Sequence, residues 1–167
     1  SGTVSVSNAK LLAATTTGTI TASIATDESV DSLKTLYDTG ETHAYSITIT
    51  ATDADASQST AAEFTAINNA TSLAVNAASV TGLASSSISD IKTLLTAGND
   101  TDQFTAASFG SLATAVVSDA TLDVSDLIDA IGEANTATGQ STADDGATVF
   151  TISDATTING GTAANFT

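Results

Sequence analysis

The sequence predicts an α/β fold in which short parallel strands alternate with helices and the strand-helix units stack as a solenoid-like repeat. The stretch Ser29–Gly40 (SVDSLKTLYDTG) returns as Ser87–Gly98 (SISDIKTLLTAG), 58 positions later. Such self-similarity is typical of repeat architectures. Strand-like and helix-like segments alternate about every 30 residues, and a helical crossover between strands predicts parallel pairing.

Composition narrows the function classes before any motif is considered. The 167 residues include 19 Asp and Glu against 3 Lys, giving a net charge of -16. Nucleic acid is excluded as a partner because it requires a basic footprint. The chain has no Cys, so disulfides, zinc-thiolate sites and cysteine nucleophiles are excluded as well. Membrane insertion is not expected, since no apolar run approaches the roughly 20 residues of a spanning helix.

The first elements follow from periodicity and capping signals. Residues 8–17 read as the end of a helix, and residues 19–25 alternate apolar and small polar side chains as a strand does. Ser29 is a predicted N-cap, followed by an apolar stripe with helical spacing. Gly40 is predicted to end this helix in a left-handed cap.

The second and third units repeat the order of a strand followed by a capped helix. Residues 44–51 place Tyr45, Ile47 and Ile49 on one strand face. A helix is predicted over 60–70, where Thr60 and Glu63 form a capping-box pattern. The third strand is predicted at 73–83, and the third helix at 88–97 with Ser87 as its cap.

The last third of the chain is less regular. Residues 99–110 read as an insertion, followed by a strand at 112–117 and a helix at 124–134 with the apolar stripe Leu127, Ile128 and Ile131. A fifth strand is predicted at 148–152. We expect one repeat-built region that belongs to a longer array. Its predicted units are 1–18, 19–43, 44–72, 73–110, 111–147 and 148–167.

A β-sandwich of cadherin-like or immunoglobulin-like repeats is the alternative fold. The stretch YSITITATDADA at 45–56 resembles the last strand of such a repeat and its Asp-rich calcium linker. Against it, those domains have no place for four amphipathic helices, and closely spaced hairpin turns are missing.

Several motifs carry a resemblance to a known class of proteins. They are Ser87–Gly98, Ala66–Thr71, Asp126–Asn135 and the Ser-Asp-Ala-Thr motifs at 118 and 153. The chain resembles the Ala/Thr/Ser-rich repeat modules of giant secreted surface proteins from marine cyanobacteria and related bacteria. The resemblance implies secretion, a cell-surface or matrix location and association with calcium, with no catalytic residue.

Calcium is the one cofactor that the acidic composition favours, because calcium binds oxygen ligands of the kind that Asp side chains in flexible loops provide. Three loops carry pairs of carboxylates that are candidate calcium ligands. They are Asp53 and Asp55, Asp100 and Asp102, and Asp144 and Asp145. None follows the spacing of an EF-hand, and the other interpretation is that they are solvated turn residues.

Nothing in the sequence favours catalysis. His43, the single His, is expected to be exposed before a strand rather than to serve as a base. Glycoside hydrolysis by paired carboxylates is disfavoured because only 4% of residues are aromatic and none is Trp. The sequence therefore predicts a non-enzymatic, extracellular structural module that assembles with copies of itself into a layer, filament or matrix. A calcium-dependent adhesin or a module that binds surface glycans is the alternative, and a hydrolase is a third hypothesis.

Overall fold

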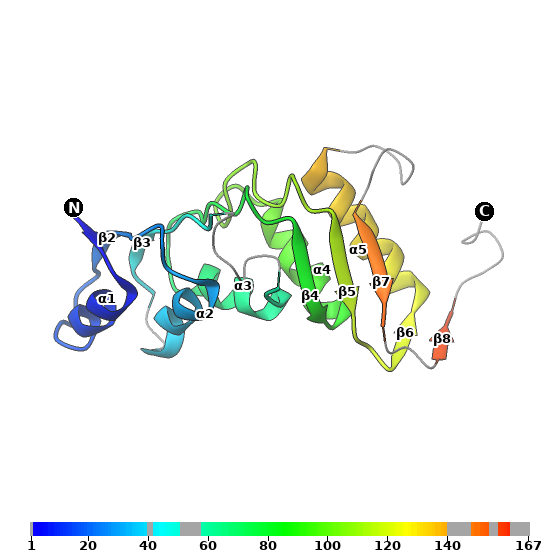
Figure 1. Cartoon of the computed structure of the whole chain (residues 1–167), viewed down its shortest axis with the longest axis horizontal. Coiled ribbons are helices and arrows are strands. Elements are labelled where there is room, and N and C mark those ends of the chain that lie inside the picture. The colour runs from blue at the N-terminus through cyan, green and yellow to red at the C-terminus, as the bar shows by residue number, and fades with distance from the viewer. Residues whose placement is uncertain (1, 40–41, 51–57, 140–147, 154–156, 161–167) are drawn as a thin grey trace.

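The protein is an elongated α/β molecule with its first and last described strands at opposite ends (Figure 1). The structure, a computed structural model, describes residues 2–39, 42–50, 58–139, 148–153 and 157–160. The strands are β1 Thr3–Val4, β2 Thr21–Ile24, β3 Ala44–Ser46, β4 Gly82–Ser86, β5 Thr114–Val117, β6 Thr121–Asp123, β7 Val149–Ile152 and β8 Thr157–Asn159. The helices are α1 Val6–Ala13, α2 Val30–Leu33, the 3-10 helix η1 Lys34–Thr39, α3 Ala61–Asn69, α4 Ile88–Gly98 and α5 Val124–Thr138.

All pairing between the described strands is parallel, as the sequence predicts. The sheets have the orders β1-β2-β3, β4-β5-β7 and β6-β8. Three isolated parallel bridges lie outside the named strands and join His43 to Thr71, Thr48 to Asn76, and Val75 to Phe104. A mixed α/β fold with parallel sheets is therefore confirmed, and the described residues contain no β-sandwich.

A regular repeat is not evident in the described part of the chain. Its strands fall into three sheets rather than one. The step between paired residues also lengthens, because Thr3 pairs with Ser23 whereas Thr114 pairs with Val149. The two copies of the motif at 29–40 and 87–98 also differ in their helical structure. The first forms four residues of α-helix followed by η1, whereas the second forms the continuous helix α4.

The predicted helix starts are confirmed. Ser29 accepts a hydrogen bond from the Ser32 N–H at 3.1 Å, and Ser87 caps α4 in the same way. The capping box of α3 has both of its bonds, since Thr60 accepts from the Glu63 N–H and Glu63 accepts from the Thr60 N–H. These side chains satisfy N–H groups that a helix leaves without intrahelical partners.

Gly98, which corresponds to Gly40 in the second copy of the motif, does not form a left-handed cap. Helix α4 runs through Gly98, and its C-cap is Asn99 in a right-handed conformation. A Cβ atom at position 98 would lie 2.8 Å from Cδ2 of Phe109. Glycine is thus required here by the close approach of an aromatic ring, not by backbone conformation. Gly40, the counterpart in the first copy, lies outside the described residues.

The predicted insertion at 99–110 supplies the centre of the core. Phe104 and Phe109 are fully buried, and the Phe109 ring lies 5.9 Å from that of Phe64 and 5.1 Å from that of Phe104, between centroids. The predicted strand at 73–83 is wrong, because the regular strand β4 begins only at Gly82. Residues of the 73–81 segment instead pack under the aromatic cluster, with Val75 and Ala77 fully buried.

Helix α5 buries only part of the predicted stripe, since Leu127 is partly buried against the core. Its buried residues are Val124, Ala130 and Ala134, whereas Ile128 is 43% exposed. Figure 1 shows α4 beside α5 toward the middle of the molecule. The apolar side chain of Ile128 therefore stays in contact with solvent.

Candidate functional site

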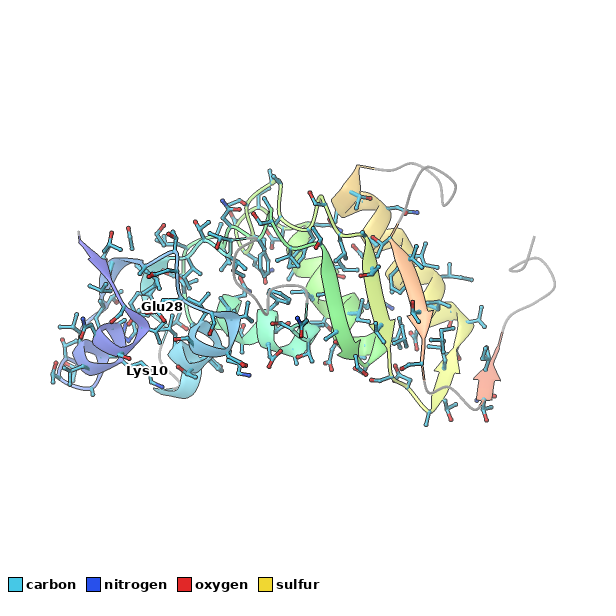
Figure 2. The ribbon with its side chains drawn as sticks, in the orientation of Figure 1. Lys10 and Glu28 are labelled. Atoms are coloured by element: carbon cyan, nitrogen blue, oxygen red, sulfur yellow. The ribbon has the colours of Figure 1, made fainter. Side chains whose placement is uncertain are left out.

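Consecutive units are joined at the starts of their helices. The first N–H of α1, that of Val6, donates to Glu28 Oε1 at 2.8 Å, and the first N–H of α4, that of Ile88, donates to Asp119 Oδ2 at 2.6 Å. Glu28 and Asp119 both follow the next strand along the chain, and Figure 2 shows Glu28 in the segment that leads to α2.

The start of helix α3 is also hydrogen-bonded to the following unit, but here the acceptor is a hydroxyl group. The Ala61 N–H donates to Oγ of Ser86, the last residue of β4, at 3.0 Å. An acceptor at a helix N-terminus also meets the positive end of the helix dipole. Each of these three helices is therefore completed by a side chain from the unit that follows it.

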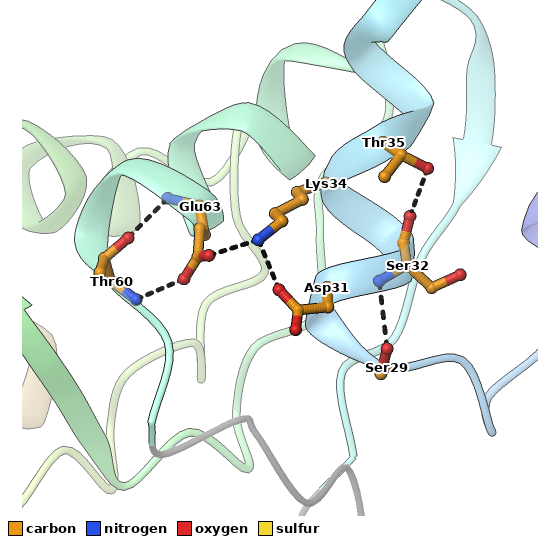
Figure 3. A network of polar contacts seen from close by, with 7 residues as sticks. All are labelled: Ser29, Asp31, Ser32, Lys34, Thr35, Thr60 and Glu63. Carbon is orange, nitrogen blue, oxygen red and sulfur yellow. Dashed lines mark hydrogen bonds and ion pairs between the residues drawn. The ribbon is translucent and has the colours of Figure 1, made fainter.

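Lys34 bridges two neighbouring helices (Figure 3). Lys34 of η1 contacts Asp31 and lies 2.6 Å from Glu63 of α3, and its hydrogen bonds to Asp31 and Glu63 raise the pKa of Lys34. Partial burial raises the pKa of Glu63, but hydrogen bonds from Lys34 and from the Thr60 N–H outweigh it, so the pKa of this carboxyl lies below its ordinary value.

Lys92, the counterpart of Lys34 in the repeated motif, makes the same kind of bridge. It lies 2.7 Å from Asp129 and 3.8 Å from Asp126, both on α5. The hydrogen bond to Asp129 raises the pKa of Lys92. In both copies of the motif the repeated lysine thus faces an acid of the next helix.

Replacing Glu63 with glutamine tests the ion pair between Lys34 and Glu63 through the pH dependence of the free energy of unfolding. Glutamine keeps the capping box but loses the ion pair, so the free energy of unfolding should fall by less than about 1 kcal/mol near pH 7. The folded-state pKa of Glu63 is lowered, so the stabilisation is present above about pH 5 and is lost as the pH falls through that pKa. Urea unfolding at several pH values should show parent and variant converging in acid. A difference that does not change with pH would contradict this role.

The molecule ends in two surfaces that expose strand edges and apolar side chains. The N-terminal face consists of β1 and of Leu11 and Leu12 on α1, which are 65% and 46% exposed. Among the described strands, β1 pairs with β2 alone. The C-terminal face consists of β7 and β8, at the edges of their sheets, and of the exposed apolar residues of this end. These are Ile128 at 43%, Val149 at 59%, Ile152 at 37% and Ile158 at 56% exposure.

Of the predicted calcium ligands, the structure describes only Asp100 and Asp102. Asp100 accepts hydrogen bonds from the Gln103 side chain at 2.9 Å and from the Asp102 N–H at 3.0 Å, and the Gln103 bond is the main cause of its lowered pKa. Among the described residues, no three His, Cys, Asp or Glu side chains gather closely enough to hold a metal ion. Asp53, Asp55, Asp144 and Asp145 lie outside the described residues, so calcium binding stays a prediction.

The expectation that His43 is exposed is wrong. Its side chain is 2% exposed, its Nδ1 accepts the Ile20 N–H at 3.4 Å, and its ring lies 5.3 Å from that of Tyr45. The signal was present in the sequence, because position 43 continues the alternation of Tyr45, Ile47 and Ile49 by one step. His43 belongs to the core face of the strand.

A groove of about 520 Å³ crosses the outer face of α4, which sequence reasoning did not predict. Its lining residues are Ser89, Lys92, Thr93, Thr96, Ala97, Gln103 and Asp126. Lys92 is held by acids of α5, and Gln103 is held by Asn68 and Asp100. These groups already have partners, so few remain to orient a ligand.

No helix in the described part of the chain is both long and apolar enough to cross a membrane. Comparisons with protein-family models, with curated proteins and with solved structures found no match to the chain.

Proposed function

We propose that the chain is a non-enzymatic structural module of a secreted bacterial surface protein, built as a solenoid-like stack and extended end to end by copies of itself. The observation that supports this most directly is the pair of end faces. Each has a parallel strand edge without a partner in the described residues, together with exposed apolar side chains.

The composition of these edges strengthens the proposal. Monomeric proteins protect edge strands with charged residues or proline, because an open edge is a template for another strand. The strands β1 (TV), β7 (VFTI) and β8 (TIN) contain neither. Stacked repeat proteins also require polar terminal units to stay soluble as monomers. Both ends therefore have the properties of joining surfaces.

The charge of the protein predicts how assembly is controlled. A net charge of -16 makes copies repel one another, and salt screens that repulsion. We expect the average mass in light scattering to rise as NaCl increases from about 20 mM to about 0.5 M, where the Debye length is short. CaCl2 and MgCl2 should act alike at equal ionic strength if screening alone operates, and Ca²⁺ should act at much lower concentration if the Asp pairs bind it.

A strictly monomeric protein at high concentration in all of these solutions would contradict the proposal. Electron microscopy of the same samples distinguishes ordered filaments or layers from irregular aggregates, and only ordered assemblies support the proposed function.

A further inference from the structure

The two end faces differ in charge. Residues 1–26, which form β1, α1 and β2, contain Lys10 and no acidic residue, so all 19 acids lie in the rest of the chain. At the other end, Asp126 and Asp129 of α5 pair with Lys92 of α4, but residues 93–167 as a whole contain 10 acidic residues and no lysine. The molecule therefore has one weakly basic end and one acidic end.

The element order at the two ends is also complementary. Every described strand pair is parallel, and β1 is followed by α1 just as β2 is followed by α2 and β4 by α4. A second copy that places β1 parallel to β7 would thus bring α1 toward α5 and continue both layers. Within the molecule, α1, α3 and α4 each have an acceptor from the next unit for their first N–H.

We infer that the C-terminal face docks onto the N-terminal face of a second copy, so that the protein assembles head to tail. This inference rests on the proposed function and specifies its partner surface. Pairing of two C-terminal faces about a twofold axis would make β7 antiparallel to itself and bring two acidic ends together. A head-to-tail contact uses two different surfaces, so it stays open after each addition and produces a filament.

Two blocked variants test the inference. Leu11→Asp with Leu12→Asp blocks the N-terminal face, and Val149→Asp with Ile158→Asp blocks the C-terminal face. All four side chains are well exposed, so folding should be retained, which circular dichroism and thermal melting check. Thr93→Asp with Thr96→Asp adds the same charge on the exposed side of α4 and is the matched control.

The expected results are specific to head-to-tail docking. Each blocked variant alone should remain at the 16.4 kDa monomer mass, and a 1:1 mixture should form a dimer and nothing larger, because only one pair of intact faces remains. The control should assemble as the parent does. If the parent assembles but the mixture stays monomeric, or the blocked variants still assemble, the inference is overturned while the proposed function stands. If the parent does not assemble, the proposed function itself fails.

Cysteine cross-linking gives a second measurement, which does not depend on the Asp substitutions that block the end faces. The chain has no Cys, and Thr3 on β1 and Thr151 on β7 are both exposed. Under mild oxidation, a mixture of the Thr3→Cys and Thr151→Cys variants should form a mixed disulfide dimer in preference to either homodimer. Random pairing alone gives twice as much mixed dimer as either homodimer, so a mixed dimer at or below that statistical share would contradict the inference.

Discussion

Replacing Phe109 with alanine is expected to lower the free energy of unfolding by about 3–5 kcal/mol, the range for deleting a buried aromatic ring. Phe109 is fully buried and makes edge contacts with the rings of Phe64 and Phe104. Its removal would leave a cavity where α3, α4 and the 99–110 segment meet. Urea unfolding followed by circular dichroism measures the loss. Phe150→Ala is the matched control, because Phe150 is only partly buried and should cost clearly less.

A double-mutant cycle with Gly98 tests the contact itself. Gly98→Ala alone should destabilise the protein, since the new methyl group would lie 2.8 Å from the Phe109 ring. In the Phe109→Ala background the clash is absent, and alanine should recover part of the roughly 1 kcal/mol by which it exceeds glycine in a helix. Equal destabilisation by Gly98→Ala in both backgrounds would show that Phe109 is not the reason for the glycine.

Replacing Thr71 with valine is expected to lower the free energy of unfolding by about 2–4 kcal/mol, although valine has nearly the same shape. The buried Thr71 hydroxyl accepts from the Tyr45 N–H at 3.0 Å and the Leu73 N–H at 3.1 Å, and it donates to the Tyr45 carbonyl at 2.6 Å. Each main-chain group left without a partner in the core costs about 1–3 kcal/mol. Thermal and urea unfolding measure the effect.

Two further variants separate the hydroxyl from the methyl group of Thr71. Thr71→Ser keeps the hydrogen bonds and should cost only about 1 kcal/mol, the value of one buried methyl group. Thr93→Val makes the same chemical change on the exposed side of α4, where the hydroxyl donates to the Ser89 carbonyl, and should alter stability by less than about 0.5 kcal/mol. A serine variant less stable than the valine variant would refute the assigned role.

Local patterns in the sequence were sufficient wherever a few neighbouring residues decide the structure. The caps at Ser29, Thr60 and Ser87, the inward face of Tyr45, Ile47 and Ile49, and the parallel pairing are all confirmed. A cap needs only a side chain three positions before the N–H that it binds, and a strand face needs only alternation. The parallel arrangement follows from the alternation of strands and helices.

Contacts between distant segments could not be predicted in this way. Nothing near Asp119 or Glu28 indicates that each binds the first N–H of a helix more than twenty residues earlier. The 99–110 segment looks like an insertion because the meeting of Phe104 and Phe109 with Phe64 depends on how three elements pack. The two end faces are likewise defined by which surfaces other elements leave uncovered.

The motif at 29–40 and its copy at 87–98 show which features the local sequence determines and which features tertiary packing decides. Its sequence determined the N-cap, the apolar stripe and the lysine that bridges to the next helix in both copies. Tertiary packing decided that the first copy ends in η1 and that the second continues as α4 through Gly98, against the ring of Phe109. Capping and helical periodicity act within one turn of the chain, whereas the choice between these helix endings depends on the space that neighbouring elements leave.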